Sequence, residues 1–544
     1  MRKFYKYSVL MLVMFLFITI LVGCGGVMVD TAKSKYTYDE AVTNINKLSA
    51  RVADVTKDDP EIYDGGAGSD FFIPDSDTSA LLPEFMTGRQ AVVNENMNDQ
   101  VMAIICSSTE KATDNATDRW LIEVAKDYNQ KADRKGSIRL YGVASGEMFD
   151  YIRSGKFVPD AFTPSNKLWG DALGLTPDYD RLAGNVAGIV SKDGKDIKQV
   201  IADVEAGTIK FGYTNPLASS TGANFLLQYI HNYSDASKFK AFQSKIALVS
   251  YTTPQMRTAA LSGKLDAFVY ESQQFSTGQV QGNQTLAKMY KFVPFGVRHD
   301  NPFYILNKAK TDLLDDFAKF CMSSENQELA NKYGFNQYDN YVGENTLGST
   351  LLDDQKNYKE NKSGGRPIVS VFVSDCSGSM NGTPLEELKK SLKACAGVIS
   401  ESNYVGLVTF ASDVKVNLSI AKFDETMQKR FITATSEMVT RGGTAMYSAL
   451  TIASKEIADF KAANPNINAV YRIFVLTDGD NTEGLSKGAT LDTLKSLGVP
   501  IYCIGYNGGN SDLDTVAGLN EAASIKITDQ NVGYALANFF KAEI

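Results

Sequence analysis

A short apolar run that ends in a carboxylate and two hydroxyls restricts how the last third of the chain can fold. Residues 368–373 are rich in β-branched side chains and follow Arg366 and Pro367, which predicts a central strand that ends at Asp375. Ser377 and Ser379 follow within four residues. In an open α/β sheet, ligands bind outside the carboxyl ends of the strands. We therefore expect these side chains to line a binding crevice.

Two later segments add oxygen-bearing side chains at the same edge. Thr444 follows a Gly-Gly pair at the start of a predicted helix, and Asp478 ends a second apolar run at residues 473–477. Five side chains are thus expected to converge. Hard divalent cations such as Mg²⁺ prefer oxygen ligands, keep some waters and use few carboxylates directly. The alternative is that the aspartates form ordinary turns and that the serines lie in a solvated loop.

The series Asp375-x-Ser377-x-Ser379, Thr444 and Asp478 resembles the complete metal-ion-dependent adhesion site of the von Willebrand factor type A (VWA) domain. The resemblance covers residues 367–544 and implies a Rossmann-like, doubly wound α/β domain. It also implies that the three hydroxyls bind the metal directly while the aspartates act mostly through water. Mg²⁺ is the expected ion, with Mn²⁺ or Ca²⁺ as alternatives. The under-neutralised metal would then attract an acidic side chain of a protein partner.

The N-terminus looks like a bacterial lipoprotein signal. Basic residues precede an apolar stretch at residues 8–22, which is shorter than the ~20 residues of a spanning helix. Gly23 then precedes Cys24, which implies cleavage after residue 23 and acylation of Cys24. We expect a lipid-anchored protein of the bacterial cell membrane that faces outside the cytoplasm. An uncleaved anchor would leave the chain on the same side.

Composition limits the classes of partner and of covalent framework. A length of 544 residues predicts about two or three domains. The net charge of −8 argues against a nucleic acid partner. An odd number of cysteines remains after Cys24, without paired spacing, so we expect buried free thiols and no disulfide framework; these are Cys106, Cys321, Cys376, Cys395 and Cys503.

Two segments have the composition of linkers. Residues 24–95 are predicted to be a tether with one possible helix, because apolar residues recur at helical spacing only between Tyr38 and Val52. Residues 346–366 are polar and charged, and we expect a second linker that leaves the VWA domain some freedom.

Residues 96–345 alternate predicted strands and helices, which indicates a mostly parallel α/β architecture in two lobes. The pattern Met256-x-x-x-Ala260-Leu261 and the later Tyr333-Gly334-Phe335 resemble the two-lobed bacterial extracellular solute-binding proteins. This periplasmic-binding-protein-like fold implies a small solute held between the lobes.

Groups that touch such a solute are expected at strand ends and helix N-termini, where free backbone N–H groups make a cradle for an anionic solute. Ordinary helix capping is the alternative for the hydroxyls. For the one arginine among the candidates, pairing with Asp300 is the favoured alternative. The candidates are Ser107, Ser108, Ser145, Ser165, Ser219, Ser220, Thr221 and Arg298.

The sequence lacks the nucleophile, phosphate-loop and dinucleotide motifs of common enzymes, and its two histidines lie in different elements. We therefore expect a non-enzymatic surface lipoprotein with a metal-dependent adhesion or assembly head and a solute-binding middle domain. One alternative is the receptor of an ABC-type transport system whose VWA domain docks a membrane partner. Another is a structural scaffold, and the least favoured is a hydrolase that uses the metal to activate water.

Overall fold

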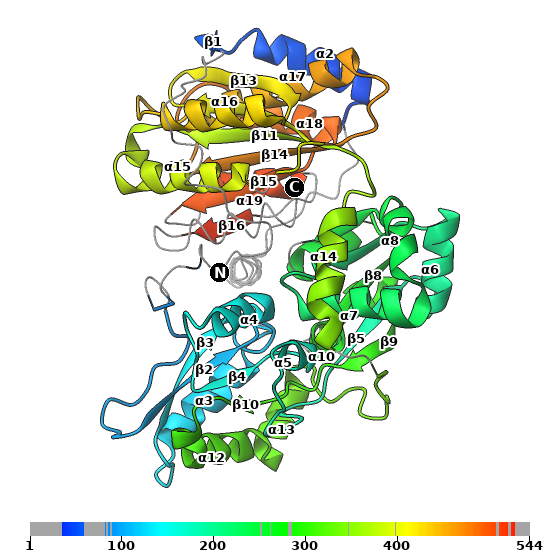
Figure 1. Cartoon of the computed structure of the whole chain (residues 1–544), viewed down its shortest axis with the longest axis vertical. Helices are drawn as coiled ribbons and strands as arrows, with labels where there is room; N and C mark the ends of the chain where they lie inside the picture. Colours follow the sequence, from blue (N-terminus) through cyan, green and yellow to red (C-terminus); the bar gives the residue numbers. More distant parts are fainter. Residues whose placement is uncertain are drawn as a thin grey trace, which may run out of the picture. The chain divides into compact units, whose positions relative to one another are not determined.

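The computed structural model describes residues 35–58, 82, 85–86, 90–250, 253–261, 263–280, 285–345, 348–397, 399–506, 511–519 and 524–527. The predicted lipoprotein signal and Cys24 lie outside these described residues. Within them, no helix has the length and apolar character needed to cross a membrane. The described strands form three sheets of seven, four and five strands (Figure 1).

The seven-stranded sheet belongs to the predicted VWA region. Its strand order is β1-β13-β12-β11-β14-β15-β16, and only β12 and β13 pair antiparallel. The central strands are mostly buried because helices cover both faces of the sheet. The strands are β1 (Val55–Lys57), β11 (Ile368–Asp375), β12 (Tyr404–Phe410), β13 (Val414–Lys422), β14 (Val470–Thr477), β15 (Ile501–Tyr506) and β16 (Ser524–Ile527).

Alternate residues of β11 point into two separate cores. Phe372 packs in one core with α15 (Thr383–Ala396) and α16 (Glu425–Ser436). Val371 and Val373 pack in the other, which contains residues of α2 (Tyr38–Ser49), α17 (Met446–Ala463), α18 (Lys487–Leu497) and α19 (Ser511–Leu519). This is the doubly wound α/β fold that the sequence predicts.

The segment that the sequence analysis assigned to a tether contributes two elements to the VWA domain. The predicted helix is present as α2, which packs against α17 and α18. Its residues Ala41, Ile45 and Leu48 are buried in the core that it shares with these helices. β1 then extends the sheet, with Val55 opposite Val414 in a parallel pair. The tether assignment is therefore wrong for residues 38–57, because an apolar stripe on a helix needs a surface on which to pack.

The first lobe of the middle region contains a four-stranded sheet of order β10-β4-β2-β3. Only β10 runs antiparallel to its neighbour. The strands are β2 (Met102–Ser107), β3 (Ser137–Gly142), β4 (Ala161–Thr163) and β10 (Tyr304–Ile305). The helices are α3 (Trp120–Gln130), α4 (Ser145–Ser154), α5 (Leu168–Ala172), α12 (Thr311–Cys321) and α13 (Ser324–Lys332).

The second lobe contains a five-stranded sheet of order β7-β6-β8-β5-β9, in which β5 runs antiparallel to β8 and β9. The strands are β5 (Val186–Ser191), β6 (Phe211–Thr214), β7 (Leu248–Ser250), β8 (Ala267–Glu271) and β9 (Lys291–Arg298). The helices are α6 (Ile197–Ala206), α7 (Ser220–Gln228) with its π-helical extension Tyr229–Tyr233, α8 (Ala236–Gln243), α9 (Thr253–Leu261), α10 (Ser272–Val280) and α11 (Thr285–Met289). The chain passes between the lobes three times, from β4 to β5, from β9 to β10 and again after α13.

The second predicted linker contains a helix, α14 (Leu351–Asn361), that packs on the second lobe. Leu351, Gln355 and Tyr358 recur on one face and are buried. The Gln355 amide donates to the Pro216 carbonyl at 2.8 Å. The prediction of a linker is therefore wrong for α14. The apolar face of this helix is short, and charged residues interrupt it, so its helical spacing is not evident from the sequence.

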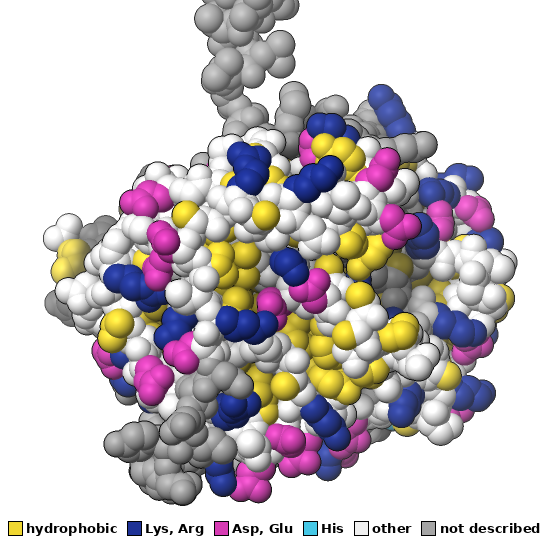
Figure 2. Space-filling view, turned by 90° about the horizontal axis from the view of Figure 1, so that it is seen from above, with side chains coloured by type: hydrophobic (Ala, Val, Ile, Leu, Met, Phe, Trp, Pro, Cys, Tyr) yellow, Lys and Arg dark blue, Asp and Glu magenta, His cyan; other side chains and the backbone are white. Residues whose placement is uncertain are grey.

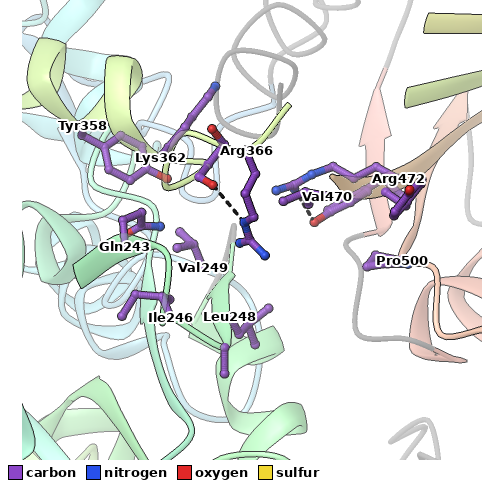
Figure 3. Close-up of a pocket in the computed structure, with 14 residues that line it drawn as sticks. Gln243, Ile246, Leu248, Val249, Tyr358, Lys362, Arg366, Val470, Arg472 and Pro500 are labelled. Carbon is purple, nitrogen blue, oxygen red and sulfur yellow. Dashed lines mark hydrogen bonds between the residues drawn. The ribbon is translucent and has the colours of Figure 1, made fainter. Parts of the chain in front are cut away.

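A cavity of about 150 Å³ lies where the chain leaves α14 for β11 (Figure 3). Within it, the Arg366 guanidinium donates to the Ser363 carbonyl at 3.1 Å, and Arg472 donates to the Tyr502 hydroxyl at 2.9 Å. Burial lowers the pKa of Arg366, and the neighbouring Arg472 charge adds to this.

Candidate metal centre and solute cleft

The topology of the seven-stranded sheet brings the two predicted aspartates to one edge. β11 and β14 are adjacent and parallel, with Ser374 opposite Leu476. Asp375 is the last residue of β11, and Asp478 directly follows β14. Both carboxylates therefore lie at the carboxyl end of the sheet, as the sequence predicts.

Hydroxyl groups connect these two aspartates. The Ser377 and Ser379 hydroxyl oxygens are 3.0 Å apart, and the Ser379 hydroxyl donates to Oδ1 of Asp478 at 2.8 Å. The backbone N–H of Ser377 donates to Oδ1 of Asp375 at 2.6 Å, and the Thr477 hydroxyl donates to its Oδ2. Four of the five predicted residues thus belong to one chain of hydrogen bonds.

Thr444 is held beside this chain by its own loop. The Gly378 N–H donates to the Gly442 carbonyl at 3.0 Å, and the Arg441 N–H donates to the Cys376 carbonyl at 2.7 Å. Gly442 has a positive φ of 54°, a conformation that favours glycine. The backbone N–H of Thr444 donates to the Thr482 hydroxyl at 2.9 Å. The loops that carry all five predicted residues are therefore neighbours.

The electrostatics of this site are dominated by a buried carboxylate. Asp375 is 0% exposed, and burial raises its pKa to about 6. Hydrogen bonds from Thr477 and Ser377 lower the pKa in part, while the charge of Asp478 raises it slightly. Among the residues that the structure describes, no lysine, arginine or histidine forms an ion pair with Asp375 or Asp478. Two carboxylates and three hydroxyls suit a hard divalent cation. The same range contains no cluster of three or more His, Cys, Asp or Glu residues arranged for a metal.

Cys376 lies within the same loop, but its thiol is buried and poorly reactive. Its side chain is 0% exposed, and burial raises the pKa of its thiol to about 12. A thiol with so little thiolate is a poor nucleophile. The described cysteines are all buried and free, as the sequence predicts: Cys106, Cys321, Cys376, Cys395 and Cys503.

A second site lies between the two lobes of the middle region as a cavity of about 310 Å³. Of the eight predicted solute residues, Ser145 and Ser219 line it. Ser145 begins α4 in the first lobe, and Ser219 is the N-cap of α7 in the second. The full lining is Thr109, Glu110, Thr113, Asn115, Asp118, Ala144, Ser145, Ala218, Ser219, Thr253 and Gln274.

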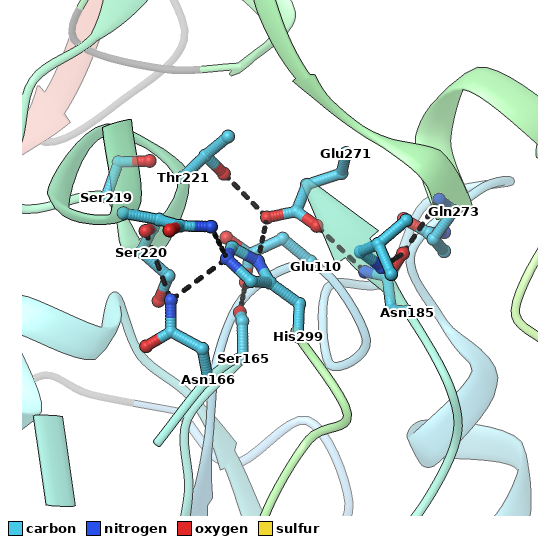
Figure 4. A network of polar contacts seen from close by, with 12 residues as sticks. Glu110, Ser165, Asn166, Asn185, Ser219, Ser220, Thr221, Glu271, Gln273 and His299 are labelled. Atoms are coloured by element: carbon cyan, nitrogen blue, oxygen red, sulfur yellow. Dashed lines mark hydrogen bonds and ion pairs between the residues drawn. The ribbon is translucent and has the colours of Figure 1, made fainter. Parts of the chain in front are cut away.

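The other predicted hydroxyls do not line this cavity and instead form hydrogen bonds within the protein, as Figure 4 shows for Ser165, Ser220 and Thr221. Their direct role as solute ligands is therefore corrected, because buried hydroxyls near a strand end find protein partners first. The Ser107 hydroxyl donates to the Ser108 carbonyl at 3.2 Å, Ser108 accepts from Lys111 at 2.7 Å, Ser165 donates to Glu110 at 3.1 Å, Ser220 accepts from Trp169 at 2.9 Å and Thr221 donates to Glu271 at 2.6 Å.

Arg298 is also absent from the cavity lining. Its guanidinium pairs with both carboxylate oxygens of Asp300, at 2.6 and 2.8 Å, and donates to the carbonyls of Tyr338 and Tyr341. The favoured alternative, pairing with Asp300, is confirmed. Arg298 therefore fixes the segment that returns from the second lobe to the first.

A buried network that sequence reasoning missed lies behind the cavity (Figure 4). Glu271 accepts from Nδ1 of His299 at 2.7 Å and from Asn185 at 2.9 Å. The amide groups of Asn166 and Asn224 lie 3.0 Å from Nε2 of His299. Since both amides donate to Nε2, that nitrogen is the acceptor and the proton of the neutral ring lies on Nδ1.

Two charged residues continue this network towards the cavity. Burial raises the pKa of Glu110, and the nearby Glu271 raises it further. Burial lowers the pKa of Lys111 to about 7, although its ammonium group donates to Ser108 and to the Thr163 carbonyl. The available signal in the sequence was the position of Glu110 and Lys111 directly after the polar residues Ser107, Ser108 and Thr109 at the end of β2.

The two lobes are in contact across the cavity. The Gly146 N–H donates to the Ala218 carbonyl at 3.3 Å, and the Gln273 amide donates to the Thr117 carbonyl at 2.9 Å. A Cβ on Gly146 would lie 2.3 Å from the Leu217 carbonyl oxygen. Glycine at this position therefore permits the close approach of the lobes.

One face of the molecule shows lysine and arginine side chains interspersed with aspartate and glutamate, with hydrophobic side chains between them (Figure 2). The view does not show the broad basic surface that nucleic acid binding requires.

Comparisons with known families agree with this division of the chain. The model of the von Willebrand factor type A domain matches residues 371–543, and that of the bacterial extracellular solute-binding protein matches residues 112–336. Both domains are binding types and not typical enzymes.

Individual relatives are distant or partial. A von Willebrand factor A domain-containing protein of Dictyostelium discoideum is 34% identical over 117 residues, which are 20% of this chain and 11% of the relative. The chain spans only 11%, 17% and 26% of the curated relatives that it matches.

Two solved structures illustrate the similarity of each part. The periplasmic binding protein AfuA of Actinobacillus pleuropneumoniae, with fructose-6-phosphate bound, is 15% identical, with a TM-score of 0.37 over 48% of this chain and 98% of that one. A von Willebrand factor type A protein of Catenulispora acidiphila is 20% identical, with a TM-score of 0.29 over 33% of this chain and 42% of that one. The two family models show that the chain combines a bacterial extracellular solute-binding domain, matched at residues 112–336, with a C-terminal von Willebrand factor type A domain, matched at residues 371–543.

Proposed function

We propose that this protein is a surface lipoprotein whose VWA domain binds a protein partner through a divalent cation. The cation would be held by Asp375, Ser377, Ser379, Thr444 and Asp478, most commonly as Mg²⁺, with Mn²⁺ or Ca²⁺ as alternatives. When bound, the cation would offer an open coordination site to an acidic side chain of the partner. Cys24 would carry the lipid anchor and keep the chain at the outer side of the bacterial cell membrane.

One observation carries the metal proposal. Asp375 is fully buried, and hydroxyl and N–H groups surround its carboxylate where a cation would be expected. A buried carboxylate without a cation carries a large desolvation cost. A divalent ion at this edge of the sheet would offset that cost and would use the three hydroxyls as neutral ligands.

We also propose that the middle domain binds a small solute between its lobes. The support is the cavity of about 310 Å³, which is of the size typical of small-molecule sites. A transport receptor whose VWA domain docks a membrane partner shares this cleft and remains the second candidate. A purely structural scaffold would bind no solute in this cavity.

The metal proposal is tested by calorimetric titration of residues 25–544 with MgCl₂ and with MnCl₂. The aspartates are expected to act mostly through water, and loss of such outer partners costs about 10–100-fold in metal affinity. We therefore expect Asp478→Ala to weaken binding by about that factor. Asp492→Asn, an exposed aspartate of α18, serves as the matched control and should bind like the parent chain. Unchanged affinity in Asp478→Ala would contradict the proposed site.

A further inference from the structure

We propose that the cleft between the lobes binds a small solute carrying a protonated amine, in place of the anion that the sequence alone suggests. This inference rests on the proposed solute-binding function and specifies its substrate class. It follows from the charges of the cavity lining, from a buried hydroxyl without a partner and from the orientation of one amide group.

The charged groups that line the cavity are all acidic. They are Glu110 and Asp118, while no lysine, arginine or histidine appears among the described lining residues. Lys111 lies behind the wall, where its ammonium group donates to the Ser108 hydroxyl and the Thr163 carbonyl. Its charge is therefore directed into the first lobe, and the solute faces two carboxylates.

The Ser145 hydroxyl provides an independent sign of a ligand. Ser145 is 3% exposed, lines the cavity and has no hydrogen-bond partner for its Oγ. A buried hydroxyl that is left unsatisfied carries a free-energy cost. A polar solute in the cavity would remove that cost by donating to this oxygen or accepting from it.

Gln274 adds a buried acceptor on the opposite lobe. Its Nε2 donates to Oδ1 of Asp118 at 3.4 Å, and this contact fixes which end of the amide faces the carboxylate. Its Oε1 is buried without a partner. A residue of the cavity lining thus carries an unpaired carbonyl oxygen next to its contact with Asp118, and an N–H donor on a solute is the group that would satisfy this oxygen.

The helix N-termini at the cavity favour an anionic solute, but their partial charges are smaller than those of the two carboxylates. α4 begins at Ser145 and α7 at Ser220, and each helix end carries roughly half a positive charge. The charges of the two lining carboxylates, when ionised, therefore exceed those of the two helix ends. An anionic solute would place a further negative charge in a partly buried acidic site, which is unfavourable.

The test uses three four-carbon probes whose terminal groups are positively charged, neutral or negatively charged. Residues 25–544 are titrated by calorimetry at pH 7.5 with butane-1,4-diamine, butane-1,4-diol and butanedioate. We expect the diamine to bind at least tenfold more tightly than the diol, and the dianion not to bind. Tighter or equal binding of the diol or the dianion would overturn the inference and leave solute binding intact.

Binding of none of the three probes would also overturn the amine assignment. Solute binding itself is then judged separately, by mass spectrometry of the small molecules that remain with the purified chain. The two failures are thus distinguishable.

Variants locate the probe in the cleft. Each substitution would remove a hydrogen-bonding partner of the bound ammonium group. We therefore expect Asp118→Asn and Ser145→Ala each to weaken diamine binding by roughly tenfold or more. Asp133→Asn, an exposed aspartate near the end of α3, is the matched control and should bind like the parent chain. Equal diamine affinity in Asp118→Asn and Asp133→Asn, with both variants folded by circular dichroism, would contradict the inference.

Discussion

At the scale of single residues, serine and threonine hydroxyls lie at both sites but in different environments. At the edge of the VWA sheet, Ser379 is hydrogen-bonded between Ser377 and Asp478. In the middle domain, Ser165 and Thr221 are bonded to buried glutamates, while Ser145 has no partner. Whether a hydroxyl is available to a ligand therefore depends on its neighbours in space.

The difference explains why one site was predictable and the other only in part. The five VWA residues follow strands and a glycine pair, and parallel topology alone brings such positions together. The solute cleft combines segments far apart in the chain, so hydroxyl-rich loops did not reveal which groups were already satisfied. Glu110 and Asp118 were missed because single carboxylates are common on solvated surfaces.

The acidic cleft predicts a pH dependence of diamine affinity. Burial raises the pKa of Glu110 and of Asp118 above the ordinary carboxyl range. A bound cation favours their ionised forms, so binding lowers these pKa values and releases protons. Affinity should therefore rise with pH from the ordinary carboxyl range up to the raised pKa values and then level off.

The other groups that face these carboxyls act on the same titration. Lys111 and the Ser165 hydroxyl oppose the raised pKa of Glu110, Glu271 supports it, and His299 is bonded to Glu271. Asn115 and Gln274 donate to Asp118. Calorimetry between pH 4.5 and 8 measures the effect, and an affinity that falls with rising pH would contradict the assignment.

At the scale of elements, the sequence predicted most strands and helices but not where two of them pack. The apolar run before Asp375 is the central strand β11, and the helical period near Tyr38 is α2. Periodicity describes one element at a time, however. Periodicity could not show that α2 packs against α17 and α18, or that α14 packs on the second lobe.

The packing of α2 predicts that the N-terminal segment stabilises the VWA domain. Ile45 is 0% exposed in the core shared with α17, and truncation of such a residue to alanine typically costs about 2–5 kcal/mol. We expect Ile45→Ala to increase hydrogen exchange in β13 and α17, measured by mass spectrometry. Lys47→Ala, on the exposed side of the same helix, should leave exchange unchanged. Equal exchange in both variants would mean that α2 is not part of this domain's core.

At the scale of the whole molecule, alternating strands and helices correctly indicated two α/β regions of different kinds. The two-lobed domain contains a cavity between its lobes, and the VWA domain presents carboxylates and hydroxyls at one sheet edge. We propose that these two sites bind different classes of ligand on one chain: a solute between the lobes and, through a metal ion, a protein at the sheet edge.

The measurement that tests this account most directly is native mass spectrometry of residues 25–544, as purified and again after chelation. We predict two separate adducts: a divalent metal that the chelator removes, and a small amine-containing molecule that remains. An amine without a metal would contradict the metal-dependent function of the VWA domain. A chain that carries neither adduct, even after incubation with MgCl₂ and butane-1,4-diamine, would contradict the two-site account as a whole.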